Sequence, residues 1–110
     1  MSSNSIKFNY DAGEDILFIY NSEKKSKGSI EYGKNLHISF SPKNDVSGLE
    51  ILNATEMFQS VFGLKTTKEN LSSITKCNLW DERSKGLIVI KFSCMLKDSK
   101  VEQKLILQDI

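Results

Sequence analysis

Hydrophobic and polar residues alternate in short segments over the first half of the chain, which predicts a series of β-strands. Ile6–Tyr10 has the two-residue period of a strand with one solvated face. Asp15–Tyr20 is apolar at both parities, which predicts a strand covered on both faces. Further strands are predicted at Ser29–Tyr32, Leu36–Phe40 and Gly48–Leu52. The short polar turns between them favour an antiparallel meander.

The pattern becomes helical after residue 52. Asn53 and Glu56 have the spacing of a capping box, in which the Asn53 side chain would accept a backbone N–H at the start of a nine-residue helix. Gly63 is placed to end this helix in the left-handed conformation. Thr66 and Glu69 repeat the capping-box spacing and predict a shorter second helix.

The last third returns to strands, predicted at Thr75–Asp81, Leu87–Leu96 and Val101–Asp109. The polar segments 82–86 and 97–100 are the predicted turns, and their shortness favours antiparallel pairing. Strand parity divides these residues between two faces. The core face would hold Cys77, Leu79, Ile88, Ile90, Phe92, Cys94, Leu96, Val101, Leu105 and Leu107. The opposite face would hold Trp80, Val89, Lys91, Met95, Lys104 and Ile106, with Lys76 beside them.

The predicted fold class is therefore α+β. We expect an antiparallel meander, one or two short helices and a C-terminal three-stranded antiparallel segment, together forming one domain over residues 1–110. The predicted core is Phe8, Ile16, Phe18, Ile38, Phe40, Leu49, Ile51, Phe58, Phe62, Ile88, Ile90, Phe92 and Leu105.

Composition narrows the function classes. The 15 Lys and Arg residues nearly balance the 14 Asp and Glu residues, which argues against a protein built around phosphate neutralisation. The balance is uneven along the chain, because residues 1–55 hold 6 Lys against 7 acids and residues 56–110 hold 9 basic residues against 7. An acidic partner would therefore bind the second half. No secretion signal or membrane-length apolar run is visible, so we expect a cytoplasmic protein that makes no membrane contact.

Two segments carry a family resemblance. Tyr10–Ile19 is similar to the opening Y-D-x-x-x-D-x-L-Y-I of domain-of-unknown-function family 2283, a family of small prokaryotic proteins. Gly48–Thr55 is similar to its ending G-x-E-I-L-x-A-S. The resemblance covers roughly residues 6–62 and leaves 64–110 as an extension. This chain departs from the family by Phe18, where Tyr is frequent, and by a long Lys-rich loop. The resemblance implies a shape and no catalytic residue.

Two polar groups offer candidate chemistry. Asp11, Glu14 and Asp15 could offer oxygen ligands to a hard cation, but the strand resumes at once, which favours a role in the turn and no metal site. His37 lies at a polar parity position and is expected to face solvent. A general base would need an orienting carboxylate and a nearby nucleophile, and the sequence has no G-x-S-x-G frame.

The two cysteines, Cys77 and Cys94, both fall on the core parity and are expected to behave as small buried hydrophobes. Their spacing matches no zinc or redox motif, which favours a reduced compartment. Phosphate-binding glycine motifs are also lacking. We therefore expect no cofactor, and nothing in the sequence makes a positive case for an enzyme.

The mixed face around Trp80 carries the functional hypotheses. The leading one is a non-enzymatic module that binds a protein partner or a second copy of itself, with Trp80 as anchor and lysines at the rim. A less favoured alternative is single-stranded nucleic-acid binding, with a base stacked on Trp80 and phosphates held by lysines. A third is an enzyme or ligand-binding domain with a site assembled from distant residues.

Overall fold

The structure is a computed structural model that describes residues 5–97 and 99–108. Two antiparallel sheets and two short helices are found in this part of the chain. The first sheet comprises β1 (Ile6–Asp11), β2 (Ile16–Asn21), β3 (Gly28–Tyr32), β4 (Leu36–Phe40) and β5 (Val46–Ile51). The helices α1 (Ala54–Ser60) and α2 (Lys68–Ser72) follow. The second sheet comprises β6 (Lys76–Ser84), β7 (Leu87–Met95) and β8 (Lys100–Gln108). The predicted α+β class is confirmed.

The strand order of the first sheet, β1-β2-β5-β4-β3, differs from a simple meander because β5 lies between β2 and β4. Apolar pairing explains this position. Leu49 of β5 lies between Ile19 of β2 and Ile38 of β4. Ile51 of β5 lies in the same way between Leu17 and Leu36. β3 offers fewer apolar residues and forms an edge with every residue exposed. The most apolar strands thus occupy the centre of the sheet.

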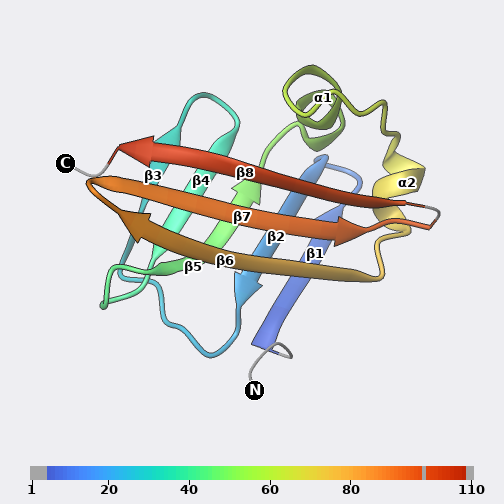
Figure 1. Ribbon diagram of the computed structural model, residues 1–110. Helices are drawn as coiled ribbons and strands as arrows, with labels where there is room; N and C mark the ends of the chain where they lie inside the picture. Colours follow the sequence, from blue (N-terminus) through green and yellow to red (C-terminus); the bar gives the residue numbers. More distant parts are fainter. Residues whose placement is uncertain (1–4, 98, 109–110) are drawn as a thin grey trace.

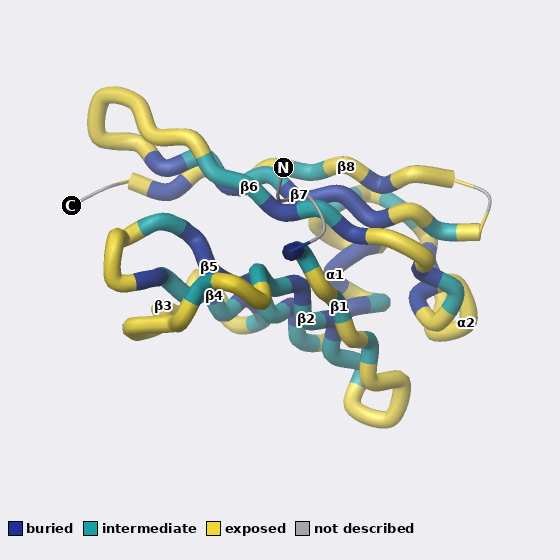
Figure 2. The backbone as a smooth tube through the Cα atoms, turned by 90° about the horizontal axis from the view of Figure 1, so that it is seen from below, coloured by how far each residue is buried: buried dark blue, intermediate teal, exposed yellow. Residues whose placement is uncertain are grey.

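The two sheets stack face to face with their strands crossing obliquely, and the core lies between them (Figure 1). Figure 2 shows buried segments along the strands of both layers, whereas the connecting loops are mostly exposed. The C-terminal parity is confirmed, because the core-face residues predicted from parity that lie within β6, β7 and β8 are buried. Leu96, also predicted for this face, lies beyond the end of β7 and packs against the core half-buried. Of the remaining predicted core, Ile38, Leu49, Ile51 and Phe58 are fully buried, whereas Phe8, Phe40 and Phe62 pack against the core half-buried.

The predicted parity of β2 is wrong. Leu17 and Ile19 are fully buried, whereas Ile16 and Phe18 are only half-buried. β2 is apolar at both parities, so its own sequence does not fix which face turns inward. The inward face is set by pairing, since Ile19 lies beside Phe8 on β1 and Leu49 on β5. The strand is therefore covered by protein on one face and not on both.

The outer face of β2 carries an aromatic pair. The rings of Phe18 and Tyr20 stack with centroids 4.8 Å apart. Gly48 on β5 lies opposite Tyr20, and a Cβ there would come within 3.2 Å of the Phe18 ring. The glycine thus lets both rings lie close to the neighbouring strand.

The predicted cap of the first helix is also wrong. Asn53 adopts a left-handed conformation with φ of 51° and makes no side-chain cap hydrogen bond. Its amide instead donates to Asn35 Oδ1 at 3.0 Å. The helix ends close to the expected place, and Gly63 is left-handed with φ of 71°, as predicted. A side chain from elsewhere caps this helix, as described below.

The second helix is displaced by one residue from the predicted capping box. Thr67 is the cap rather than Thr66, and Asn70 rather than Glu69 completes the box. Thr67 Oγ1 accepts from the Asn70 N–H at 3.1 Å, and Asn70 Oδ1 accepts from the Thr67 N–H at 3.0 Å. Thr66 is buried and its hydroxyl donates to the Leu64 carbonyl. An Asn at the third helical position can close the box as Glu does, because its side chain also carries an acceptor oxygen.

The first strand of the β6–β7 hairpin extends farther toward the turn than predicted. β6 continues to Ser84 and β7 begins at Leu87, so the turn is Lys85–Gly86 rather than the whole segment 82–86. Both turn residues have positive φ, 50° for Lys85 and 82° for Gly86. This is the two-residue hairpin turn whose twist matches the twist of the strands. Residue 109, the predicted end of the last strand, lies outside the described residues.

Replacing Lys85 by Asn should stabilise the protein, because Asn tolerates positive φ and Lys does not. We expect Lys85→Asn to raise the free energy of unfolding by roughly 0.5–1 kcal/mol, because it relieves the unfavourable backbone conformation of Lys85. Urea denaturation would measure this gain. Lys85→Gln is the matched control, because it removes the same charge without favouring positive φ. Equal stabilisation by both variants would assign the effect to charge and contradict the backbone explanation.

The helices are short, with seven residues in α1 and five in α2. No helix in the described ranges is long and apolar enough to cross a membrane.

Candidate functional site

The predicted interaction residues all lie on one face of the second sheet. The register places Trp80, Lys91 and Lys104 side by side across β6, β7 and β8. Glu82, Val89 and Ile106 form the adjacent row. We call this surface the outer face of the β6–β8 sheet, and it also contains Lys76, Asn78, Leu87, Ser93, Met95, Lys100 and Glu102. In both views none of the described strands or helices lies over it (Figures 1 and 2).

Large apolar side chains on this outer face are exposed to an unusual degree. Leu87 is 42% exposed, Met95 is 40% exposed and Ile106 is 51% exposed. Each belongs to a regular strand whose opposite face is packed in the core. Leu87 and Ile106 lie near each other at the end of the sheet beside the β6–β7 turn, whereas Met95 lies at the opposite end of β7. Exposed apolar residues on one regular face are typical of interaction surfaces.

The charges on the outer face are mixed. Lys91 Nζ lies 3.0 Å from Glu82 Oε1 on the neighbouring strand. Lys104 lies directly opposite Lys91 on the other side, and like charges at directly opposed positions destabilise a sheet. A depression of about 390 Å³ is lined here by Trp80, Lys91, Glu102, Gln103 and Lys104. The central row therefore combines an aromatic side chain with two adjacent lysines.

His37 lies on the outer face of the first sheet, at the polar position that its parity predicts, but it is more constrained than expected. Its Nδ1 lies 3.1 Å from Glu50 Oε1, and its Nε2 lies 3.5 Å from Glu31 Oε2. Both carboxylates come from neighbouring strands at the directly paired positions. A general base needs one ring nitrogen free for the substrate, and here each nitrogen faces a carboxylate. The geometry favours a cross-strand charge cluster.

The acidic residues of the first turn are used for structure. Asp11 Oδ1 accepts from the Glu14 N–H at 3.1 Å, which organises the turn. Asp15 crosses to the start of α1, where Thr55 donates to it through Oγ1 at 2.7 Å and through its N–H at 3.2 Å. Tyr10 Oη donates to the same carboxylate at 2.7 Å. Across the described residues, no group of His, Cys, Asp and Glu is arranged to hold a metal ion.

The Asp15 network shifts two pKa values in opposite directions. Burial by itself would raise the pKa of Asp15, but hydrogen bonds from Thr55 and Tyr10 outweigh it and hold the pKa below its usual value. Burial and the hydrogen bond to Asp15 raise the pKa of the Tyr10 phenol. Asp15 therefore caps α1 by accepting hydrogen bonds from Thr55, and Tyr10 holds the Asp15 carboxylate in place. This is the cap that Asn53 was predicted to supply.

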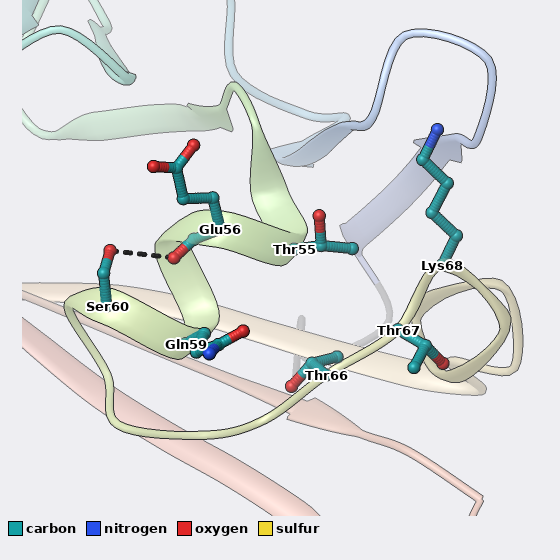
Figure 3. Close-up of a pocket in the computed structure, with 7 residues that line it drawn as sticks. All are labelled: Thr55, Glu56, Gln59, Ser60, Thr66, Thr67 and Lys68. Carbon is teal, nitrogen blue, oxygen red and sulfur yellow. Dashed lines mark hydrogen bonds between the residues drawn. The ribbon is translucent and has the colours of Figure 1, made fainter.

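A polar depression lies between the two helices (Figure 3). It has a volume of about 710 Å³ and is lined by Thr55, Glu56, Gln59, Ser60, Thr66, Thr67 and Lys68. The Ser60 hydroxyl donates to the Glu56 carbonyl at 2.8 Å and is thus occupied by the helix itself. The sequence pattern did not predict this depression, because its lining comes from two helices and the connection between them. It contains hydroxyls and both signs of charge.

A groove with mixed apolar and polar lining opens between the two sheets at the β3 edge. It has a volume of about 470 Å³ and is lined by Ile30, Phe40, Asn44, Arg83, Ile88, Leu107 and Gln108. Ile30 is 48% exposed because β3 extends beyond the cover of the second sheet. No local sequence signal could predict this groove, because it depends on how the two sheets are offset.

Comparison with known proteins finds similarity to a family in the segment that forms the first sheet. The sequence model of the family described as "Protein of unknown function (DUF2283)" matches residues 7–54, which include β1 to β5 apart from the first residue of β1. An uncharacterized protein of Methanocaldococcus jannaschii is 40% identical over 53 residues. That alignment covers 48% of this chain and 45% of the relative, so the chain spans less than half of the relative's length. No solved structure matches.

The matched segment explains the two sequence motifs in structural terms. Tyr10 and Asp15 come from the first motif, and Thr55 directly follows the matched segment within the second motif. The hydrogen bonds described above join these residues into one cap, so the fold brings the two motifs together. The model of the family of unknown function DUF2283 thus matches the part of the chain in which the motif resemblance was found.

Proposed function

We propose that this protein is a non-enzymatic module that associates with a second copy of itself through the outer face of the β6–β8 sheet. The observation that carries the proposal is the exposure of Leu87, Met95 and Ile106 on that uncovered face. Burying such side chains against a partner is the main favourable contribution to most protein association. Half-buried Trp80 on the same face supplies a large aromatic side chain of the type that anchors interfaces.

Mixed charge favours a second copy over a strongly charged partner. The outer face holds Lys76, Lys91, Lys100 and Lys104, and it also holds Glu82 and Glu102. A two-fold arrangement brings the same surface from both copies together, so carboxylates of one copy become available to lysines of the other. An acidic partner would gain from the lysines but would be repelled by both glutamates.

The size of the face predicts a weak association. Three nine-residue strands cover a footprint of roughly 30 Å by 14 Å, or about 420 Å² per copy. Stable specific interfaces bury about 800 Å² per partner. We therefore expect a reversible dimer with a dissociation constant on the order of micromolar or weaker.

Sedimentation analysis over a range of protein concentrations tests this proposal. Ile106→Glu should weaken self-association at least about tenfold, because a charge would be buried in the interface. Val61→Glu is the matched control, since Val61 is 58% exposed at the end of α1, away from the outer face. The control variant should associate like the original protein. A protein that stays monomeric at high concentration, or equal effects of both substitutions, would refute the proposal.

The row of Trp80, Lys91 and Lys104 favours single-stranded nucleic acid as a second candidate partner. Bases stack on aromatic side chains with little sequence preference, and lysines beside them pair with phosphates. With a fluorescent single-stranded DNA oligonucleotide as probe, this function predicts binding that weakens steeply with salt. It also predicts loss of binding in Trp80→Ala and Lys91→Glu. The absence of binding at low salt would eliminate this candidate.

A further inference from the structure

The two cysteines, 17 residues apart in sequence, are direct neighbours in the second sheet. Cys77 on β6 is paired with Cys94 on β7 in the antiparallel ladder. The Cys77 thiol donates to Cys94, with the two Sγ atoms 3.4 Å apart. Both residues are buried, at 5% and 1% exposure, and both are free thiols. The sequence predicted their burial but gave no indication that they meet.

We propose that Cys77 and Cys94 form a modification site, a dithiol that a peroxide converts into an intramolecular disulfide. Residues directly opposite each other in antiparallel strands have Cα atoms about 4.5–5.5 Å apart. Disulfides span Cα separations of about 4.4–6.8 Å, so the backbone spacing is already suitable. The sulfur atoms need to approach by only about 1.4 Å to reach the bonding distance of about 2.05 Å.

The oxidation proceeds in two balanced steps. One cysteine loses its proton, and its sulfur attacks an oxygen of hydrogen peroxide; the O–O bond breaks, a sulfenic acid forms and the departing hydroxide takes a proton to become water. The second cysteine then loses its proton and its sulfur attacks the sulfenic sulfur, forming the S–S bond; the hydroxide that leaves takes that proton and becomes a second water. Two thiols and one peroxide thus give one disulfide and two waters. The sulfurs are oxidised and the peroxide oxygens are reduced.

The surroundings of the pair select the oxidant. The hydrogen bond to Cys94 and burial both raise the pKa of the Cys77 thiol, so the reactive thiolate is scarce in the closed fold. Disulfide reagents such as oxidised glutathione reach the buried sulfur atoms only when the hairpin opens, and therefore react more slowly than the smaller peroxide. We therefore expect slow oxidation, through brief opening of the hairpin, to a disulfide that the fold then shields. The bond would join β6 to β7 near the α2 end of the sheet, in the hairpin that also carries Trp80 and Lys91.

Mass spectrometry of the full-length protein tests the site. The reduced protein is treated with hydrogen peroxide, unfolded and alkylated with N-ethylmaleimide. We expect the monomer to lose two hydrogen atoms in mass and to take up no label, and a non-reducing peptide map should show the Cys77–Cys94 link. Dithiothreitol should restore both reactive thiols. Cys77→Ala is the control and should keep one alkylatable thiol that forms no internal link.

An equilibrium measurement shows whether the folded structure favours the disulfide or whether the cysteines are oxidised without any help from the fold. In glutathione redox buffers, the disulfide should be favoured at least about tenfold more in the folded protein than in urea, because the fold holds the sulfurs together. By linkage, the oxidised protein should melt about 5–10 °C higher than the reduced protein. Two labelled thiols after peroxide treatment, links between molecules, overoxidation of single cysteines or a lower melting temperature of the oxidised form would each overturn the proposal.

Discussion

Phe92→Ala should lower the free energy of unfolding by about 3–5 kcal/mol. Phe92 lies on the central strand of the second sheet and is fully buried. Its ring contacts the Phe62 ring edge-on at 5.5 Å, and Phe62 in turn contacts Phe58 of α1 at 5.3 Å. Removing it leaves a cavity and also loosens the contact that holds a seven-residue helix, too short to be stable alone. This is a large share of the free energy of unfolding of a native domain, which is only roughly 5–15 kcal/mol.

Urea denaturation followed by circular dichroism measures this loss, and Phe18→Ala is its matched control. Phe18 is the same residue type, but it lies half-buried on the outer face of the first sheet, stacked on Tyr20. We expect its truncation to cost about 1–2 kcal/mol, from partial burial and one aromatic pair. Equal losses in the two variants would contradict the assignment of Phe92 to the core and Phe18 to the surface.

The contrast between these two phenylalanines shows what periodicity can predict. In β7, polar residues such as Lys91 alternate with Ile90 and Phe92, so the inward face could be predicted from the strand itself. Phe18 belongs to β2, where the run Ile16–Tyr20 is apolar throughout and both registers satisfy the same pattern. The choice was made by neighbours distant in sequence, among them Leu49. Local pattern cannot contain that information.

The same limit applies to the caps and to the candidate sites. Asn53 has the right residue type for a cap, but the fold brings Asp15 to the helix start from another turn, 40 residues away. The outer face around Trp80 could be predicted because parity within three regular strands defines it. The groove at Ile30 and the Cys77–Cys94 pair could not, because they depend on sheet offset and on strand register.

Asp15→Asn should destabilise the protein by about 2–3 kcal/mol at neutral pH. Asp15 has a positive φ of 58°, which Asn also tolerates, so the substitution keeps the backbone and the side-chain shape. It replaces one carboxylate oxygen, which accepts hydrogen bonds, by an NH₂ group, which can only donate. The hydroxyls of Tyr10 and Thr55 both donate to this side chain, so one of them would face another donor. Hydrogen bonds to charged groups contribute about 1.5–3 kcal/mol, and the conflict between donors adds to their loss. Urea denaturation at pH 7 would measure the difference.

Asp45→Asn is the matched control for this substitution. The hydrogen bonds from Lys24 and Ser41 hold the pKa of Asp45 below its usual value, as the Asp15 network does for Asp15. Its side chain is 38% exposed, however, and solvent screens its pairing with Lys24. An exposed ion pair contributes at most about 1 kcal/mol, so the control variant should lose less than Asp15→Asn. If Asp45→Asn lowered the free energy of unfolding more than Asp15→Asn does, the conclusion that Asp15 contributes more to stability would be contradicted.

The pH dependence of the Asp15→Asn difference tests its electrostatic origin. Because the pKa of Asp15 is lower in the folded protein than in the unfolded chain, its ionised form stabilises the fold. That contribution is complete above the unfolded pKa, near 4, and is lost as the pH falls through the folded pKa. The gap between the original protein and Asp15→Asn should therefore narrow below about pH 4. A gap of constant size from pH 7 to about pH 2.5 would show that shape, and not the carboxylate charge, makes Asp15 important.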